Sequence, residues 1–237
     1  MKLRLLVPFV FLLSKLAFAH GVKVNGLKEI IVQNNLNVTL EKSKAHRHSK
    51  VPQAVTAERI GDRLILKSSS SELQNVKLYA SDNFRNLRQL IVQDSSSVKA
   101  SYIQTHMLKV ISESSGSLML DHVKGVSEIT NHGEGKIEAY WLGLPSIDVV
   151  ASNGKTLLGG NTDNVLVKGY GDAQVNLSGL VTNNAWVLAS DDAFIKIRAN
   201  DFISMVGHGN AIVESYKDVN FLNEVSYDQS ALIHIRS

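Results

Sequence analysis

The sequence predicts an all-β fold: a right-handed parallel β-helix (β-solenoid) of about eight rungs of 18–20 residues, with an N-terminal β region before them. Three observations lead to this prediction. Short runs of aliphatic and β-branched residues alternate with Gly, Ser, Asn and Asp, which is typical of strands joined by turns. The runs recur at a nearly constant spacing, and one position of the repeat is apolar every time.

Residues 1–19 have the features of a secretory signal peptide. Lys2 and Arg4 precede the apolar run Leu5–Leu13, and Ala17-Phe18-Ala19 places small residues where a signal peptidase cleaves. We therefore predict an exported protein, periplasmic or secreted to the cell surface, that is cleaved after Ala19. The apolar run is too short to cross a bilayer and no later run is longer, so we expect no transmembrane segment after signal removal.

The predicted mature chain carries no net charge. The whole chain has 25 Lys and Arg against 22 Asp and Glu, and the signal peptide contains three basic residues and no acidic one. The balance after cleavage is therefore 25 − 3 = 22 basic against 22 acidic residues. This excludes the strong positive field of a nucleic-acid-binding protein, so we expect no nucleic acid partner. The chain has no cysteine, and hence no disulfide framework.

Residues 20–87 form the predicted N-terminal β region of one continuous domain that spans 20–237. Three β-rich runs fall in it, Glu29–Val32, Val38–Leu40 and Arg63–Leu66. Each is bounded by turn-forming residues, as expected for short strands.

Residues 88–237 contain the predicted β-helix repeats. We place an anchor on the apolar residue after each polar turn: Val98, Leu118, Ile137, Leu157, Val175, Ile195, Val213 and Ile233. The position eight residues before each anchor is apolar in all eight units, and the position two before it is small in seven. Such alternation indicates strands with one buried face, and stacked identical units pair in parallel with right-handed crossovers. A two-sheet β-sandwich is the competing interpretation.

The turns resemble those of a known family. Ser114-Ser-Gly-Ser-Leu118, Gly169-Tyr-Gly-Asp172 and Gly207-His-Gly-Asn210 are similar to the glycine-serine corners of the auto-transporter adhesin head GIN domain family. The opening Leu27–Val32 and Gly61–Leu66 is similar as well. The resemblance implies a β-helix at the cell envelope with an adhesin-like role, and it implies no catalytic residues.

Asp172 and Asp192 are the candidate metal ligands. Both lie three residues before an anchor on adjacent rungs, so their Cα atoms should lie about 5 Å apart. Two carboxylates at that separation could hold a cation. The alternative is that they are corner residues that cap backbone groups. No other spacing suggests a metal site, and the sequence predicts no cofactor.

Trp186 marks the candidate ligand-binding surface. The column nine residues before the anchor faces outward by alternation, and it contains Asp148, Leu166, Trp186 and Glu224. An aromatic ring on a flat strand face, between two carboxylates, is suited to stacking against a sugar. The alternative is that Trp186 packs over Leu166 as a surface patch or contacts another subunit.

These features favour a non-catalytic exported protein with an adhesin-like binding or scaffold role at the bacterial cell envelope. A glycan or an envelope protein is the expected partner. The alternative is a carbohydrate-active enzyme, a polysaccharide lyase or hydrolase, on the same fold. Such an enzyme needs titratable residues that converge in a cleft, and the sequence assigns no catalytic residue.

Overall fold

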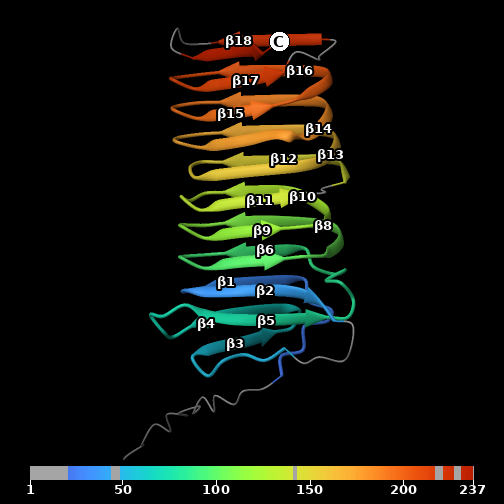
Figure 1. The fold of residues 1–237 in the computed structure, drawn as a ribbon, viewed down its shortest axis with the longest axis vertical. Helices are drawn as coiled ribbons and strands as arrows, with labels where there is room; N and C mark the ends of the chain where they lie inside the picture. The colour runs from blue at the N-terminus through green and yellow to red at the C-terminus, as the bar shows by residue number, and fades with distance from the viewer. Residues whose placement is uncertain (1–20, 44–48, 141–142, 217–220, 227–230, 237) are drawn as a thin grey trace, which may run out of the picture.

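The protein is one long β-solenoid built from stacked strands (Figure 1). The computed structural model describes residues 21–43, 49–140, 143–216, 221–226 and 231–236. All the regular secondary structure within these ranges is β-strand. The predicted signal peptide lies outside the described residues. The strands are β1 (Glu29–Gln33), β2 (Leu36–Lys42), β3 (Val55–Ile60), β4 (Arg63–Ser68), β5 (Gln74–Ala80), β6 (Gln89–Val92), β7 (Ser97–Ala100), β8 (Ile103–Ser112), β9 (Ser117–Leu120), β10 (Val123–Asn131), β11 (Lys136–Tyr140), β12 (Leu144–Ala151), β13 (Lys155–Gly169), β14 (Gln174–Ala189), β15 (Phe194–Ile197), β16 (Ala199–Gly207), β17 (Ile212–Tyr216), β18 (Phe221–Ser226) and β19 (Leu232–Arg236).

Each turn of the solenoid contributes one strand to each of two sheets, which we call sheet A and sheet B. In stacking order, sheet A contains β4, β1, β6, β8, β10, β12, 162–169 of β13, 182–189 of β14, β16 and β18. Sheet B contains β5, β2, β7, β9, β11, 155–160 of β13, 174–180 of β14, β15, β17 and β19. All these pairings are parallel, so the predicted β-helix is confirmed and the β-sandwich is wrong.

The core lies between the two sheets and is made by alternate residues of each strand. The inward column of sheet A contains Leu64, Ile30, Leu90, Val110, Ile129, Val149, Val167, Val187 and Met205, all buried. From Leu90 to Met205 this is the column that the repeat predicts to be apolar. Burying each such side chain stabilises the fold by about 1.5–3 kcal/mol, so the column holds neighbouring turns in register.

One anchor was assigned to the wrong residue. Ile137 pairs with Thr156 and Thr156 with Val175, so Thr156 and not Leu157 occupies the inward position of that turn. Thr156 is fully buried, and its hydroxyl has no hydrogen-bond partner among the described residues. The corner before it is one residue shorter than those of the two neighbouring turns, so Thr156 takes the position that Ile137 and Val175 occupy there. A rule that requires an aliphatic anchor misses such a threonine.

The N-terminal region departs from the order of the chain. β1 pairs with β4 on one side and with β6 on the other, and β2 likewise lies between β5 and β7. The first strands along the chain therefore form the second turn of the stack, visible as blue strands between teal and green ones in Figure 1. β3 then pairs with β4 in antiparallel fashion and forms the last strand at this end.

One edge of the solenoid is formed by tight corners between sheet A and sheet B. The corner residues Asp94, Ser114 and Asp191 have left-handed backbone angles, with φ of 55°, 60° and 60°. Asp tolerates this conformation better than most residues. Gly135 is required for a different reason, because a Cβ there would lie 1.7 Å from the carbonyl oxygen of Gly116 in the turn below. The polar turn residues of the repeat are thus explained by backbone geometry.

Candidate functional site

Trp186 lies on the outer surface of sheet A, in the column that the sequence predicts. Asp148 pairs with Leu166, Leu166 with Trp186 and Trp186 with Ser204, so these side chains follow one another along the stack. Trp186 is 42% exposed, whereas Leu166 and Ser204 are half-buried. The structure therefore brings together Asp148, Leu166 and Trp186. Their role in binding stays a prediction.

Glu224 does not belong to this column. β18 pairs Asn223 with Ser204 and Glu224 with Met205, so Asn223 takes the position expected of Glu224. The next strand keeps the predicted register, with Val213 paired to Ile233. The connection from β18 to β19 is thus one residue longer than the connection from β16 to β17 in the preceding turn. Counting back from Ile233 at a constant distance gives the wrong residue.

Aromatic and aliphatic neighbours extend the Trp186 surface. The Phe202 ring lies beside it, with centroids 5.5 Å apart and planes inclined at 46°. Leu188 and Val206 pair with each other two residues further along the same two strands, and both are half-buried on the same outer surface. We call Leu166, Trp186, Leu188, Phe202 and Val206 the Trp186 surface. The sequence pattern did not single out Phe202, although the alternation on β16 places it outward, two residues before Ser204.

Polar groups border the Trp186 surface. The side-chain nitrogen of Asn184 donates to Oδ1 of Asn164 at 3.0 Å, and the side-chain nitrogen of Asn164 donates to the carbonyl of Pro145 at 3.3 Å. Asp148 is exposed at the lower side. Below it, Nζ of Lys109 lies 2.6 Å from Oε2 of Glu128. The hydrogen bond and charge of Glu128, with the charge of Asp148, raise the pKa of Lys109 above its ordinary value.

Asp172 and Asp192 share a corner column, but each is engaged in corner hydrogen bonding. Oδ1 of Asp192 accepts a hydrogen bond from the side-chain amide of Asn210 at 3.0 Å. The backbone N–H of Asp172 donates to Oδ1 of Asn153 at 3.3 Å. Within the described ranges, no three His, Cys, Asp or Glu side chains group as a metal site would require. The Asp192 carboxylate therefore caps a side-chain amide, whereas at Asp172 it is the Asn153 side chain that caps the backbone N–H.

Asp191, next to this pair, is the corner carboxylate with a shifted pKa. The backbone N–H of Gly171 donates to Oδ2 of Asp191 at 3.1 Å, and the hydroxyl of Ser190 donates to it at 3.0 Å. The Gly171 hydrogen bond first, and the Ser190 hydrogen bond next, lower the pKa of Asp191 below its ordinary value. Asp191 is exposed, and both hydrogen bonds favour the ionised form of its carboxylate.

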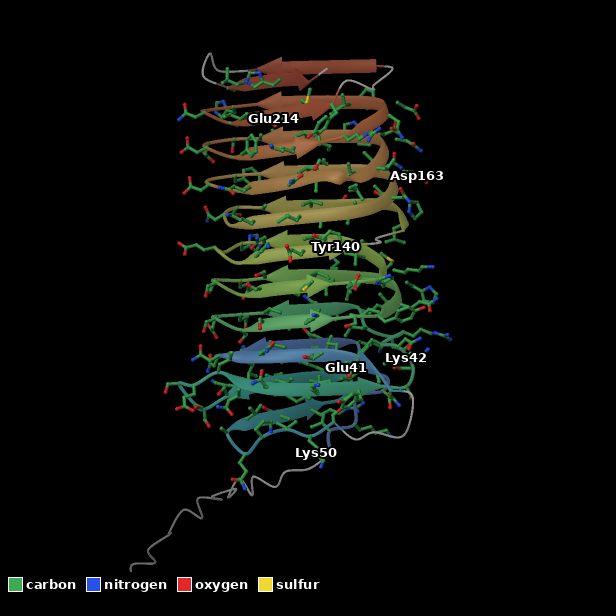
Figure 2. All side chains as sticks on the ribbon, viewed as in Figure 1. Glu41, Lys42, Lys50, Tyr140, Asp163 and Glu214 are labelled. Carbon is green, nitrogen blue, oxygen red and sulfur yellow. The ribbon has the colours of Figure 1, made fainter. Side chains whose placement is uncertain are left out.

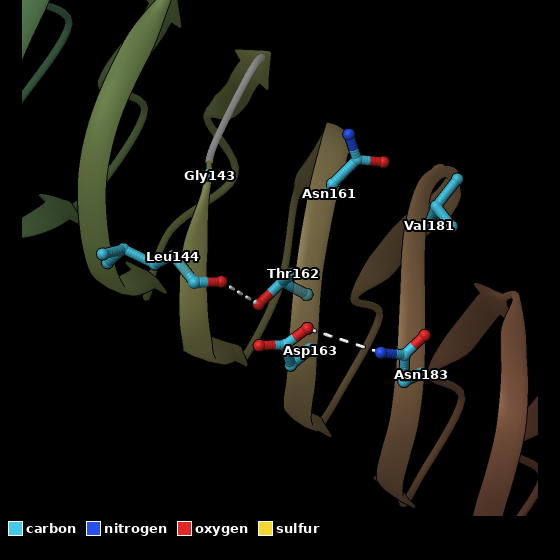
Figure 3. Close-up of a pocket in the computed structure, with 7 residues that line it drawn as sticks. All are labelled: Gly143, Leu144, Asn161, Thr162, Asp163, Val181 and Asn183. Atoms are coloured by element: carbon cyan, nitrogen blue, oxygen red, sulfur yellow. Dashed lines mark hydrogen bonds between the residues drawn. The ribbon is translucent and has the colours of Figure 1, made fainter.

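A polar hollow of about 300 Å³ lies at the other edge of the solenoid, where sheet B returns to sheet A (Figure 3). Figure 2 shows Asp163 projecting from this edge. The side-chain nitrogen of Asn183 donates to Oδ1 of Asp163 at 3.4 Å, and the hydroxyl of Thr162 donates to the Leu144 carbonyl at 2.7 Å. Asn161 and Val181 line the remaining wall. The sequence pattern did not indicate this hollow because the edge varies in length from turn to turn.

The described residues contain no helix long and apolar enough to cross a membrane. No family model matches the chain, and no curated protein matches it. Solved structures do match it. A "putative adhesin" from Parabacteroides merdae ATCC 43184 has a TM-score of 0.75 at 11% identity, covering 92% of this chain and 95% of that one.

Two further structures are similar over the same share of the chain. A "putative lipid binding protein" from Parabacteroides distasonis ATCC 8503 has a TM-score of 0.71 at 16% identity, covering 92% of this chain and 96% of that one. A "putative adhesin" from Bacteroides fragilis NCTC 9343 has a TM-score of 0.61 at 12% identity, covering 92% and 95%. The likeness is one of fold. The resemblance to the GIN domain family stays a prediction.

Proposed function

We propose that the protein is a non-catalytic, exported binding protein with an adhesin-like role at the bacterial cell envelope, and that the Trp186 surface contacts a glycan. The exposed Trp186 ring carries this proposal. It projects from a strand paired on both sides, so binding would order little of the protein. A sugar presents an apolar ring face and a rim of hydroxyls, which match the ring and the bordering amides of Asn164 and Asn184.

Export and the absence of catalysis are parts of the same proposal. The charged start, apolar run and Ala17-Phe18-Ala19 of the signal peptide support export. The hydrogen bond from the Asn210 amide to the Asp192 carboxylate supports a structural role for Asp192 over an acid-base role. The neighbours named as adhesins and as a lipid binding protein support a binding role over an enzymatic one.

A glycan binding screen with product analysis on the same samples tests the proposal. We expect the cleaved chain to bind at least one envelope or host glycan and to release no product. Trp186→Ala should abolish the binding, and Trp186→Phe should retain part of it because a smaller ring can still stack. Met119→Ala is the matched control, since Met119 is 40% exposed on sheet B, away from the Trp186 surface.

Two results would count against the proposal. Equal binding by the wild type and Trp186→Ala, with both folded, would move the site elsewhere. Cleaved or eliminated products in the screen would favour the carbohydrate-active enzyme.

A further inference from the structure

A shallow groove on sheet B combines positive charge with an apolar floor. It has a volume of about 280 Å³ and spans three adjacent turns of the solenoid. Lys155, Gln174 and Phe194 form one wall, since they pair in sequence along the stack. Leu157, Asn176 and Lys196 form the other wall in the same way. None of these residues belongs to the Trp186 surface, so the groove is a separate site.

Among the described residues around the groove, one ammonium group, that of Lys155, has no carboxylate partner. Nζ of Lys196 lies 3.2 Å from Oε2 of Glu214, which Figure 2 labels in the upper stack, and 5.1 Å from the centre of the Phe194 ring. Nζ of Lys136 lies 2.5 Å from Oε1 of Glu138. Three lysines thus face two glutamates, and the surplus positive charge is at Lys155.

The position of Lys155 makes that surplus unfavourable in the free protein. Lys155 pairs directly with Lys136 in the turn below, so two like charges stand side by side on adjacent strands. Such a pair destabilises a sheet. An anion bound at Lys155 would relieve the repulsion, which makes the groove complementary to a negatively charged ligand.

The rest of the groove selects a ring with hydroxyl groups. Leu157 and Phe194 supply apolar side chains to the groove, one on each wall, and both are half-buried. Two such side chains offer too little apolar surface to cover an acyl chain. Oδ1 of Asn176 accepts hydrogen bonds from the backbone N–H of Ser178 at 3.0 Å and from its hydroxyl at 2.7 Å. This orients the amide, and its nitrogen makes no hydrogen bond to the described residues. Gln174 is exposed beside it. Both amides can bind hydroxyls.

We propose that this groove binds a uronate residue of an acidic polysaccharide. The carboxylate lies at Lys155, the ring face lies on Leu157 and Phe194, and the hydroxyls bind Gln174 and Asn176. Lys196 is held by Glu214 and Phe194, and it supplies a second, fixed ammonium group at the far end. This inference stands apart from the proposed role of Trp186, because the two sites lie on different sheets.

Calorimetric titration with tetramers of galacturonate, glucuronate and mannuronate tests this proposal on the folded, cleaved chain. We expect at least one tetramer to bind and its methyl ester, which keeps the ring but not the charge, to bind about tenfold more weakly. Raising the salt concentration should weaken binding, because exposed charges are screened. Lys155→Gln should also weaken it about tenfold. Lys99→Gln, an exposed lysine on the same sheet outside the groove, should leave it unchanged.

Two further arms distinguish uronate binding in the groove from binding at the Trp186 surface and from binding of an anionic lipid. Trp186→Ala should bind the tetramer as the wild type does, and a loss there would assign the uronate to the Trp186 surface. Vesicles of phosphatidylglycerol provide the anionic lipid. The proposal is overturned if none of the tetramers binds, if Lys155→Gln and Lys99→Gln behave alike, or if Lys155 is needed only for vesicle binding.

Discussion

The repeat stack and the N-terminal end of the described chain are built in different ways. In the repeat stack, β6 to β19, the strands stack in the order of the chain. From β8 onward, each strand pairs with the equivalent strand one repeat earlier, as Leu118 does with Val98 and Val213 with Ile195. In the N-terminal end, β1 to β5, the second turn of the stack comes first in the chain and β3 runs antiparallel.

The contacts differ as the topology does. In the repeat stack, the turns are held by a repeated apolar column. The N-terminal end shares this column through Leu64 and Ile30, but polar contacts made only once also fasten its segments. Arg59 donates from Nη1 to the Lys23 carbonyl at 2.6 Å, and Nζ of Lys28 lies 2.7 Å from Oδ2 of Asp62. A solenoid end exposes an open strand edge, and the charged residues of β3 protect that edge from pairing with other chains. The comparison indicates that a repeated local pattern builds the stack and that unique contacts close it.

The largest effect is expected from a charge in the inward column of the stack. Val187→Asp would bury an unpaired carboxylate between Val167 and Met205, and we expect it to lower the free energy of unfolding by about 4 kcal/mol or more. Urea unfolding followed by circular dichroism measures this.

Two controls define that result. Trp186→Ala, one residue away on the outer surface, should change the free energy by at most about 1 kcal/mol. Ile60→Asp lies on β3 of the N-terminal end, where Ile60 is 56% exposed, and should have a similarly small effect. Equal damage from Val187→Asp and Trp186→Ala would show that the inward and outward columns are misassigned.

Most of the stack was predictable from sequence because its signal is local and repeated. Val187 was assigned inward and Trp186 outward from alternation alone. Thr156 was missed because a threonine can fill an apolar position, and Glu224 was misplaced because one corner is longer. The insertion of β1 and β2 was missed for a different reason. Their alternation fits any turn of the stack, so nothing local specifies which strands they pair with.

The second effect compares equivalent leucines in the two regions. Leu64 and Leu90 occupy the same inward column, on either side of Ile30, and both are fully buried. Replacing either with Ala should reduce the free energy of unfolding by about 2–4 kcal/mol. Since solenoid stability is a sum over neighbouring turns, Leu64→Ala should loosen mainly the terminal turn.

Hydrogen exchange read by mass spectrometry separates the two leucine variants. Leu64→Ala should speed exchange in 55–80 and leave β10 to β17 protected. Leu90→Ala should lower protection on both sides of β6. Uniform loss of protection across the chain in Leu64→Ala would mean that the N-terminal end and the stack unfold as one unit.

A smaller effect is expected from two glycines that are needed for different reasons. Gly135→Ala would place a Cβ 1.7 Å from the Gly116 carbonyl oxygen of the preceding turn, so the stack must shift, at a cost of about 1–3 kcal/mol. Gly61, in the turn between β3 and β4, has a φ of +62° with nothing within 4 Å of the added Cβ. Gly61→Ala should cost only the backbone strain, about 1 kcal/mol. Thermal melts that rank the two variants equally would contradict the close-packing account of the stack corners.

The smallest effect compares two exposed aspartates whose pKa values are lowered for different reasons. The hydrogen bond from Lys28 is the main cause for Asp62 in the N-terminal end, and the backbone N–H of Gly171 is the main cause for Asp191 in the stack. A carboxyl with a lowered folded pKa contributes stability above its unfolded pKa, about 3.9, and that contribution disappears as the pH falls through the folded value. Both Asp62→Asn and Asp191→Asn should therefore be less stable than the wild type at pH 7 and equally stable in strong acid.

Salt distinguishes the two aspartates at pH 7. The exposed ion pair of Asp62 with Lys28 is screened at about 1 M salt, where the Debye length is about 3 Å, so the difference between the wild type and Asp62→Asn should close. The Asp191 carboxylate instead accepts hydrogen bonds from the neutral backbone N–H of Gly171 in the preceding turn and from Ser190, so the difference for Asp191→Asn should persist. Urea midpoints at low and high salt measure both. If salt closes the Asp191 difference or spares the Asp62 difference, then the stack corner and the N-terminal end are not held by different kinds of contact.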